Sequence, residues 1–493
     1  MHACLLIPEI LQHIFSDIHD VPSGLPPWDR FSQPGRQESR RSLAALSLVC
    51  RSFKDIALDM LWAELKNLEP LFTCLPPDLW ARTDDQKLIM QRSATTEDWL
   101  VFEKYASRVR VLGHSDVFGR IDAKFIHDIM GFSSQSLLVP NLRVLSCGRC
   151  PRGLHSFMGY LLGPHLVNLR LTAWEADFWT TVMSPVVSSL GRHSPQLEVI
   201  TLPTMPRQIN ALAGLSRLQT VSLASLSDET LSTLSCLVGL RELDITITEP
   251  FDGGKLQSCT SCLDKLVIRS SSTLTFAGQT VEGWVVQCRS LELRFFRPET
   301  AVDVRFALCK LVNILLWDGL ECILLNGTKM DDAFSLDTFT PLMQFSGLQE
   351  VSLTSFCMSL IDDVALGSII KSWTRLRRLD LGTAHFWQTR PRITFCGLVT
   401  LLSSCPELTS LGLVFDATNV GPPTDEKPEG GVCNTNIINF RVGCSPIEQP
   451  QQVAVALSAI LPCLREINVE IFWGPDRDIR KAKWSEVLER IGN

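Results

Sequence analysis

The sequence lacks the marks of a membrane or secreted protein. No uncharged apolar run approaches the ~20 residues that cross a bilayer. The start, Met1–Ile7, has no Lys or Arg before its apolar residues, and Pro8 and Glu9 interrupt that short run. A secretory signal needs a basic lead and a longer apolar core. We therefore expect an intracellular protein, cytoplasmic or nuclear, that does not bind membranes.

The sequence also lacks a basic stripe. Its 46 Lys and Arg face 53 Asp and Glu, which gives a net charge of −7 that is spread along the chain. A protein that coats nucleic acid phosphates needs clustered positive charge. We therefore expect no nucleic acid partner.

Catalytic and metal-binding motifs are missing as well. Nothing matches Gly-x-Ser-x-Gly, the P-loop pattern or His-Glu-x-x-His. Cys147-x-x-Cys150 and Cys259-x-x-Cys262 have zinc-like spacing, but each pair lacks two further ligands and the pairs lie far apart in the chain. We favour buried or loop cysteines over a metal site, and expect no catalytic residue and no cofactor.

What the sequence does contain is a repeat, apolar-x-x-apolar-x-apolar, from the middle of the chain to near its end. One copy reads Leu142-Arg-Val-Leu145-Ser-Cys147. The mean spacing of the copies is about 27 residues, inside the range of leucine-rich repeats. Thirteen copies start at Leu142, Leu166, Leu197, Leu218, Leu240, Leu263, Cys288, Leu320, Leu348, Leu376, Leu408, Ile437 and Leu464. In each copy the last two apolar residues point inward from a short strand, which must stack on its neighbours to bury them.

The repeat predicts an α/β fold. We expect an irregular leucine-rich-repeat solenoid over residues 136–475, with parallel strands on its concave side and helices on its convex side. A segment rich in Pro and Gly predicts a loop insertion near 416–451, and residues 476–493 predict a C-terminal helical cap.

Outward positions on the predicted strands carry charges of both signs, which suits a protein target but names none. The candidate target-binding residues are Arg170, Glu242, Asp244, Arg269, Arg294, Glu350, Arg378 and Asp380.

Residues 1–66 do not follow the repeat and predict a small helical domain. Ile7, Ile10, Leu11 and Ile14 share one face of a first helix. A second apolar pattern runs from 42 to 62, and a polar loop with several Pro and Gly is predicted between the two patterns, at 17–41. Short apolar helices must pack together or against a partner. A helical connector and solenoid N-cap is expected at 67–135.

This amino-terminal pattern resembles the F-box, a small helical domain that binds a Skp-type adaptor. The resemblance is carried by Pro8, Glu9, Ile10, Leu11, Ile14, Phe15, Val49, Cys50, Arg51, Phe53, Leu61 and Trp62. Two features depart from the family pattern: Ile7 replaces the usual Leu before Pro, and the loop at 17–41 is inserted. The order of parts, from helical domain through connector to leucine-rich repeats, resembles F-box proteins that basidiomycete fungi carry in large families.

The resemblance implies a non-catalytic substrate-recognition subunit of a Skp/cullin/F-box ubiquitin ligase. It implies a Skp-type adaptor as partner, a cullin bound through that adaptor, and an unknown protein target on the repeats. The implied adaptor contacts are Pro8, Ile10, Leu11, Ile14, Val49, Phe53 and Trp62. The alternative is a leucine-rich-repeat interaction scaffold with no ligase attached, in which the amino-terminal helices only cap the solenoid.

Overall fold

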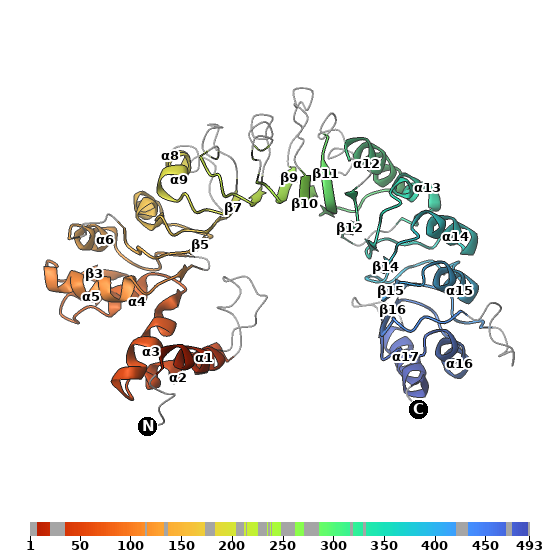
Figure 1. Cartoon of the computed structure of the whole chain (residues 1–493), viewed down its shortest axis with the longest axis horizontal. Coiled ribbons are helices and arrows are strands. Elements are labelled where there is room, and N and C mark those ends of the chain that lie inside the picture. Colours follow the sequence, from red (N-terminus) through yellow and green to blue (C-terminus); the bar gives the residue numbers. More distant parts are fainter. Residues whose placement is uncertain are drawn as a thin grey trace. The chain divides into compact units, whose positions relative to one another are not determined.

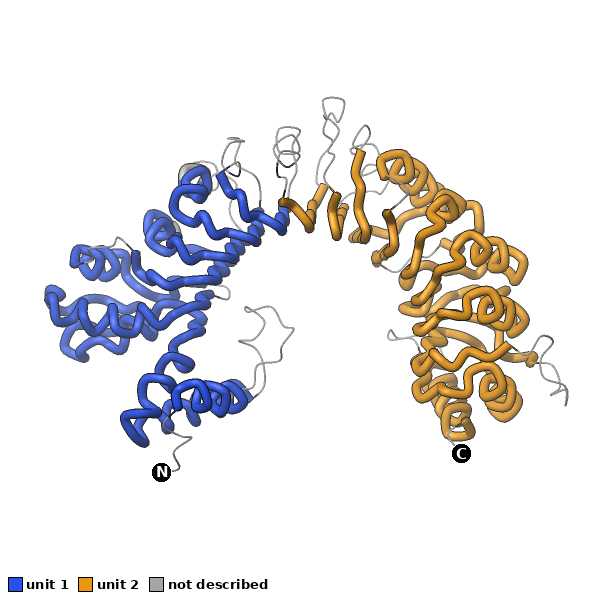
Figure 2. The backbone as a smooth tube through the Cα atoms, in the orientation of Figure 1, with its two compact units in different colours: residues 1–223 blue, residues 224–493 orange. Residues whose placement is uncertain are grey.

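The computed structural model describes residues 7–19, 35–113, 116–132, 137–172, 183–203, 212, 214–224, 234, 237, 239–247, 262–270, 285–315, 319–328, 332–420, 432–469 and 476–491. The chain divides into two compact units, Met1–Leu223 (unit 1) and Ala224–Asn493 (unit 2) (Figure 2).

Unit 1 begins with three packed helices, α1 (Pro8–His19), α2 (Arg36–Leu46) and α3 (Arg51–Ala63), which we call the N-terminal helical domain (Figure 1). Their shared core consists of Leu11, Phe15, Leu43 and Ala57, each exposed by 2% or less. Phe53 of α3 meets Phe15 of α1 edge-on, with ring centroids 5.4 Å apart. A core of this size can bury only part of the apolar surface of three helices.

The predicted loop at 17–41 is wrong at both ends. Residues 17–19 complete α1, and α2 already begins at Arg36, well before residue 42. Gly35 has a φ of +86°, a conformation that glycine adopts without steric cost, and it turns the chain into α2. The sequence hides this helix because Leu43 is its one buried residue, so almost no apolar periodicity marks it.

The segment after the helical domain mixes helices and short strands. It contains β1 (Glu64–Leu65), α4 (Glu69–Thr73), β2 (Trp80–Arg82), β3 (Leu88–Met90), α5 (Thr96–Ala106), β4 (Val111–Leu112) and α6 (Ala123–Met130). β2 and β3 form an antiparallel pair, and a capping box between Thr95 and Asp98 starts α5. β1 and β4 pair in parallel, so the main sheet already begins at the end of the predicted 1–66 domain and continues through the predicted helical connector, before the predicted start of the solenoid. Strands of two residues show no alternation that a sequence could reveal.

The sheet of unit 1 continues from β4 through β5 (Val144–Cys147), β6 (Asn168–Leu171), β7 (Val199–Leu202) and β8 (Thr220–Leu223), each parallel to the one before. Between these strands run η3 (Arg152–Leu161), α8 (Ser184–Ser188) and α9 (Leu190–His193).

Unit 2 holds a second run of parallel strands. They are β9 (Glu242–Ile247), β10 (Cys262–Ser270), β11 (Gln287–Phe295), β12 (Cys322–Gly327), β13 (Glu350–Leu353), β14 (Arg378–Leu381), β15 (Ser410–Leu413), β16 (Asn439–Gly443) and β17 (Glu466–Val469). The intervening helices are α12 (Ala301–Ile314), α13 (Leu336–Phe339), η8 (Thr340–Gln344), α14 (Asp363–Ser372), α15 (Phe395–Ser404) and α16 (Pro450–Ile460). Within the unit these helices lie on one side of the strands (Figure 1).

The predicted leucine-rich-repeat fold is confirmed. Every one of the thirteen predicted repeat copies contributes one of the strands β5 to β17. Alternate residues of each strand point into the layer between strands and helices; in β14, for example, Leu379 and Leu381 are both 1% exposed. Stacking of neighbouring repeats buries what one repeat cannot bury alone.

The predicted loop insertion near 416–451 is only partly a loop, because it contains the repeat strand β16, and α16 begins before its end. The most Pro- and Gly-rich part of that prediction, 421–431, lies outside the described residues. Beyond β17, α17 (Arg477–Ile491) packs on α16 and β17. Its Trp484 is 1% exposed, and the indole N–H donates to the carbonyl of Ser445 at 3.1 Å. Within the part of the chain that the structure describes, no helix is both long and apolar enough to cross a bilayer.

Candidate functional site

The first helix carries apolar residues on two neighbouring faces. Leu11 and Phe15 point inward and are 1% and 2% exposed. Ile10 and Ile14 lie on the outer face of the helix and are 37% and 39% exposed, and Ile7, directly before the helix, is 44% exposed. The i, i+3/i+4 spacing makes each set a stripe, and only the inner stripe is used by the core. The outer stripe is apolar surface without a described partner in this chain.

A second group of exposed apolar side chains lies in the turn between α2 and α3. The backbone N–H groups of Leu48 and Val49 still bond to the carbonyls of Ala45 and Leu46, at 3.0 and 3.2 Å, and the chain then becomes extended at Cys50. This short turn leaves Leu48 85% exposed and Val49 62% exposed. Each fully buried side chain of this size gains roughly 1.5–3 kcal/mol when it leaves water, so the turn favours contact with a partner.

The structure divides the predicted adaptor contacts. Pro8, Ile10, Ile14 and Val49 are exposed. Leu11 lies instead in the internal core, so its side chain is not available for direct contact. The sequence places Leu11 on one helical face with Ile10 and Ile14, because a face defined by i, i+3 and i+4 spacing is wide enough to include both the inner and the outer stripe of α1.

Phe53 and Trp62 are partly buried and contribute to packing. Phe53 covers the inner core through Phe15, while the Trp62 ring lies 4.6 Å from the ring of Tyr105, which belongs to α5. Leu48 is missing from the predicted contacts, although it is the most exposed large apolar side chain among the described residues. The sequence already indicated this exposure, because Leu48 does not follow the buried Leu43 at the i+3 or i+4 spacing of one helical face.

Two ion pairs also link the helical domain to the segment that follows it. Arg108, directly after α5, reaches α3, where it pairs with Asp55 at 2.9 Å and also with Asp59. The Arg108 side chain is 15% exposed, but those of Asp55 and Asp59 are 73% and 62% exposed, so water screens both pairs and each contributes little stability.

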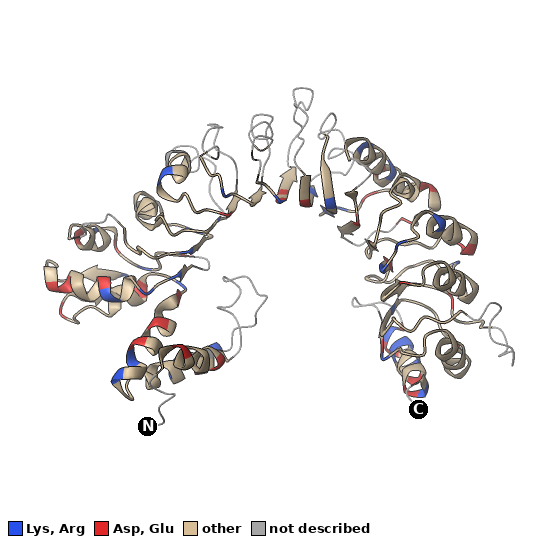
Figure 3. Ribbon diagram, in the orientation of Figure 1, with Lys and Arg blue, Asp and Glu red and all other residues tan. Residues whose placement is uncertain are grey.

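The predicted target-binding residues fall into both units. Arg170 lies in unit 1, half-buried on β6 between Ser146 and Thr201 of the neighbouring strands. The other seven lie on the outward face of the strands in unit 2, where residues of both signs are visible (Figure 3). Glu242 is exposed, and its register partner is Lys265.

Several of these charges pair with one another. Arg269 of β10 forms an ion pair with Asp244 of β9, and Arg378 of β14 lies 3.5 Å from Glu350 of β13. The second pair is weak, because the Arg378 side chain is 64% exposed. The outward face is therefore a row of largely matched charges.

Glu292, which the predicted set omits, is the centre of one such group. It is 4% exposed, accepts a hydrogen bond from Arg294 at 2.6 Å and pairs with Lys265 at 3.1 Å. Burial raises the pKa of the Glu292 carboxyl, but the bonds from Arg294 and Lys265 outweigh burial and leave the pKa below its usual value.

Asp380 is a correction to the predicted surface, because it is only 2% exposed. Its carboxylate accepts a hydrogen bond from the Thr383 hydroxyl at 2.7 Å and pairs with Arg441 at 2.9 Å. The register places Gly412 between Asp380 and Arg441, and a Cβ on Gly412 would collide with the Asp380 carboxylate. The glycine thus opens the space in which an Arg two strands away covers Asp380. Burial raises the pKa of Asp380, more than Arg441 and Thr383 lower it.

Of the two cysteine pairs with zinc-like spacing, Cys147 and Cys150 lie within the described residues. Burial raises the pKa of the Cys147 thiol to about 12, and it also raises the pKa of Cys150. Cys259 lies outside the described residues. Within the described ranges, no group of three or more His, Cys, Asp or Glu side chains is placed to hold a metal ion.

Comparison with known protein families identifies the N-terminal helical domain. Residues 8–67 match the family described as F-box-like, a range that spans α1 to β1, so the N-terminal helical domain is F-box-like. No curated protein matches the chain. Among solved structures, it is similar to the leucine-rich-repeat ectodomain of the plant membrane receptor kinase GASSHO1/SCHENGEN3 from Arabidopsis thaliana, in complex with CASPARIAN STRIP INTEGRITY FACTOR 2. That match has 12% identity and a TM-score of 0.30 and covers 76% of this chain and 48% of the ectodomain, so the chain spans about half of that protein's length.

Proposed function

We propose that this protein is the substrate-recognition subunit of a Skp/cullin/F-box ubiquitin ligase. In this role the F-box-like domain binds a Skp-type adaptor and, through it, a cullin, while the leucine-rich repeats bind a protein target. The protein works inside the cell, in the cytoplasm or the nucleus. The order of its parts supports a relationship to the F-box proteins of basidiomycete fungi.

The observation that carries the proposal is the apolar surface of the F-box-like domain. Ile10 and Ile14 on α1 and Leu48 and Val49 in the turn before α3 are exposed in a domain whose small core already has its own residues. Exposed apolar side chains gathered on one small domain mark a protein interface. The matching family model supports a Skp-type adaptor as the occupant.

The proposal assigns no chemical step to this chain. Holding a target beside a ubiquitin-loaded enzyme turns a bimolecular transfer into an effectively intramolecular one, which lowers the entropic part of the barrier. The residues that matter are therefore those that bind and orient. The outward face of the unit 2 strands, with its paired charges, is the proposed target surface.

Co-purification of the full chain with a Skp-type adaptor tests the proposal. We expect the wild type to retain the adaptor and the Ile10→Ala, Ile14→Ala double variant to lose it. Leu100→Ala is the matched control, because Leu100 is also exposed, by 58%, but lies on α5 outside the F-box-like domain. A wild type that does not retain the adaptor would favour the leucine-rich-repeat scaffold without a ligase. Equal loss in the Leu100 control would show that any exposed apolar side chain promotes capture.

A further inference from the structure

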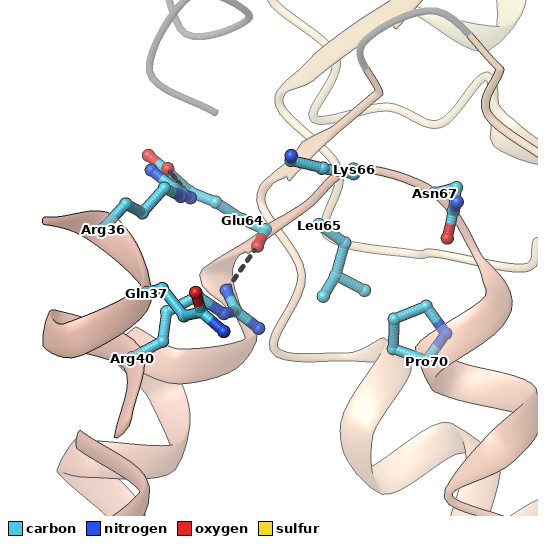
Figure 4. A pocket seen from close by; sticks show the side chains of 8 residues that line it. All are labelled: Arg36, Gln37, Arg40, Glu64, Leu65, Lys66, Asn67 and Pro70. Carbon is cyan, nitrogen blue, oxygen red and sulfur yellow. Dashed lines mark hydrogen bonds and ion pairs between the residues drawn. The ribbon is translucent and has the colours of Figure 1, made fainter. Parts of the chain in front are cut away.

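A cavity of about 540 Å³ lies where the F-box-like domain meets the first strand of the sheet. One wall is α2 and the other is β1 with the residues that follow it (Figure 4). The lining residues are Arg36, Gln37, Arg40, Glu64, Leu65, Lys66, Asn67 and Pro70. None of them belongs to the exposed apolar surface proposed for the adaptor.

Positive charge dominates the described lining of the cavity. Among these residues Arg36, Arg40 and Lys66 are cationic, and Glu64 carries the one carboxylate. The Arg36 guanidinium pairs with that carboxylate at 2.7 Å, and the two side chains are only 10% and 9% exposed. This excess is a local exception, because the whole chain carries a net charge of −7.

Arg40 is held beside this pair. Its guanidinium donates to the backbone carbonyl of Glu64 at 3.2 Å, a bond that satisfies a donor but does not neutralise a charge (Figure 4). Burial lowers the pKa of Arg40, and the nearby charge of Arg36 lowers it further, more than Glu64 raises it. The Arg40 guanidinium thus lies beside the Arg36–Glu64 ion pair with a backbone carbonyl, not a carboxylate, as its acceptor, an arrangement that an added anion would stabilise.

The shape and chemistry of the lining narrow the class of anion. A guanidinium presents its donors in a planar fork that matches phosphate oxygens, and Lys66 adds a mobile point charge. Leu65 and Pro70 add an apolar wall. The volume exceeds what a single phosphate fills and lies in the ~300–1,000 Å³ range of small-molecule sites.

We propose that this cavity binds a small organic phosphate, with its phosphate group between Arg36 and Arg40 and within reach of Lys66. Because the two walls come from α2 and β1, the bound ligand would join the F-box-like domain to the start of the repeat sheet. The proposal does not depend on adaptor binding, and neither result decides the other.

Calorimetric titration of the full chain with inorganic pyrophosphate, at constant ionic strength, tests this site. We expect saturable binding by the wild type and about tenfold weaker binding in each of Arg40→Ala and Lys66→Ala, since each removes a charged donor. Arg41→Ala is the matched control, because Arg41 is exposed on the same helix and does not line the cavity. It should bind within about twofold of the wild type.

The melting temperature of each variant without pyrophosphate shows whether it is folded, and Lys66, which is exposed, can be replaced without loss of core contacts. The wild type should melt at a higher temperature as pyrophosphate is added, because the ligand binds only the folded state. Absence of binding by the wild type would overturn the proposal. So would an Arg41→Ala loss as large as that of Lys66→Ala, since it would show general attraction rather than a site.

Discussion

The F-box-like domain and the outward strand face of unit 2 differ in the chemistry of their surfaces. The domain exposes Ile10, Ile14 and Leu48, which no other described part of the chain covers and which gain free energy when a suitable surface covers them. On the strand face, Glu292 and Asp380 are already covered by Arg or Lys partners. A ligand there must exchange one set of partners for another, which favours selectivity over affinity. The contrast fits one constant partner on the domain and selective target binding on the repeats.

The largest effect is expected when a charge is placed on the inward, buried face of a strand. Leu379→Asp buries a carboxylate with no partner, because Leu379 is 1% exposed in β14. We expect a loss of about 3–5 kcal/mol in the free energy of unfolding. The adjacent Arg378→Ala, on the outward face, should stay within about 0.5 kcal/mol of the wild type. Denaturant unfolding measures both, and equal losses would show that the inward and outward faces are assigned incorrectly.

A smaller effect is expected at Gly412, where the absence of a side chain leaves room for the Asp380 carboxylate. Gly412→Ala places a Cβ against the Asp380 carboxylate and should separate it from Arg441. We expect a loss of about 1–3 kcal/mol, the usual range for overpacking. Gly367→Ala on α14 is the control, since its Cβ would meet no atom nearer than 4.0 Å and alanine favours the helix. A neutral Gly412→Ala would mean that the ion pair does not need this space.

The two buried carboxylates of the strand face should respond to pH in opposite directions. The pKa of Asp380 is raised in the folded chain, so its protonation stabilises the fold at low pH, and this contribution disappears as pH rises through the raised pKa. The pKa of Glu292 is lowered, so its contribution is present above its usual value of 4.5 and is lost as pH falls through the lowered pKa.

Unfolding curves between about pH 3 and pH 7 give the free energy of unfolding of the wild type and of each variant in which one carboxyl is replaced by the corresponding amide. The stability of Asp380→Asn relative to the wild type should improve as pH rises, whereas that of Glu292→Gln should improve as pH falls. Parallel curves for the two variants would contradict the different surroundings assigned to these groups.

The sequence predicts the repeat strands far better than the surfaces. Each copy, such as the one that starts at Leu376, carries its apolar positions within six residues, so local spacing identifies the strand. β1 and β4, with two residues each, contain no such spacing. Helix α2 escapes prediction because only Leu43 in it is buried.

The surface assignments fail for a different reason. Whether Ile10 or Leu11 faces the core depends on where α3 packs, which no local pattern contains. Asp380 looks like an outward charge from its strand position, yet it is covered by Arg441, 61 residues later, through a gap left by Gly412. Such contacts arise only when distant repeats stack, so a sequence can name the strand position but not its exposure.

The central claim is that the outer stripe of α1 binds a Skp-type adaptor while the inner stripe holds the domain together. The most direct measurement is a calorimetric titration of a purified Skp-type adaptor into the full-length wild type, the Ile10→Ala, Ile14→Ala double variant and Leu11→Ala, with a melting curve of each. We expect the double variant to bind about 2–4 kcal/mol more weakly and to melt like the wild type. We expect Leu11→Ala to cost about 2–5 kcal/mol of folding free energy in the domain, because it empties part of the core. Undiminished binding by a folded double variant, or no binding by the wild type, would contradict an adaptor site on the outer stripe.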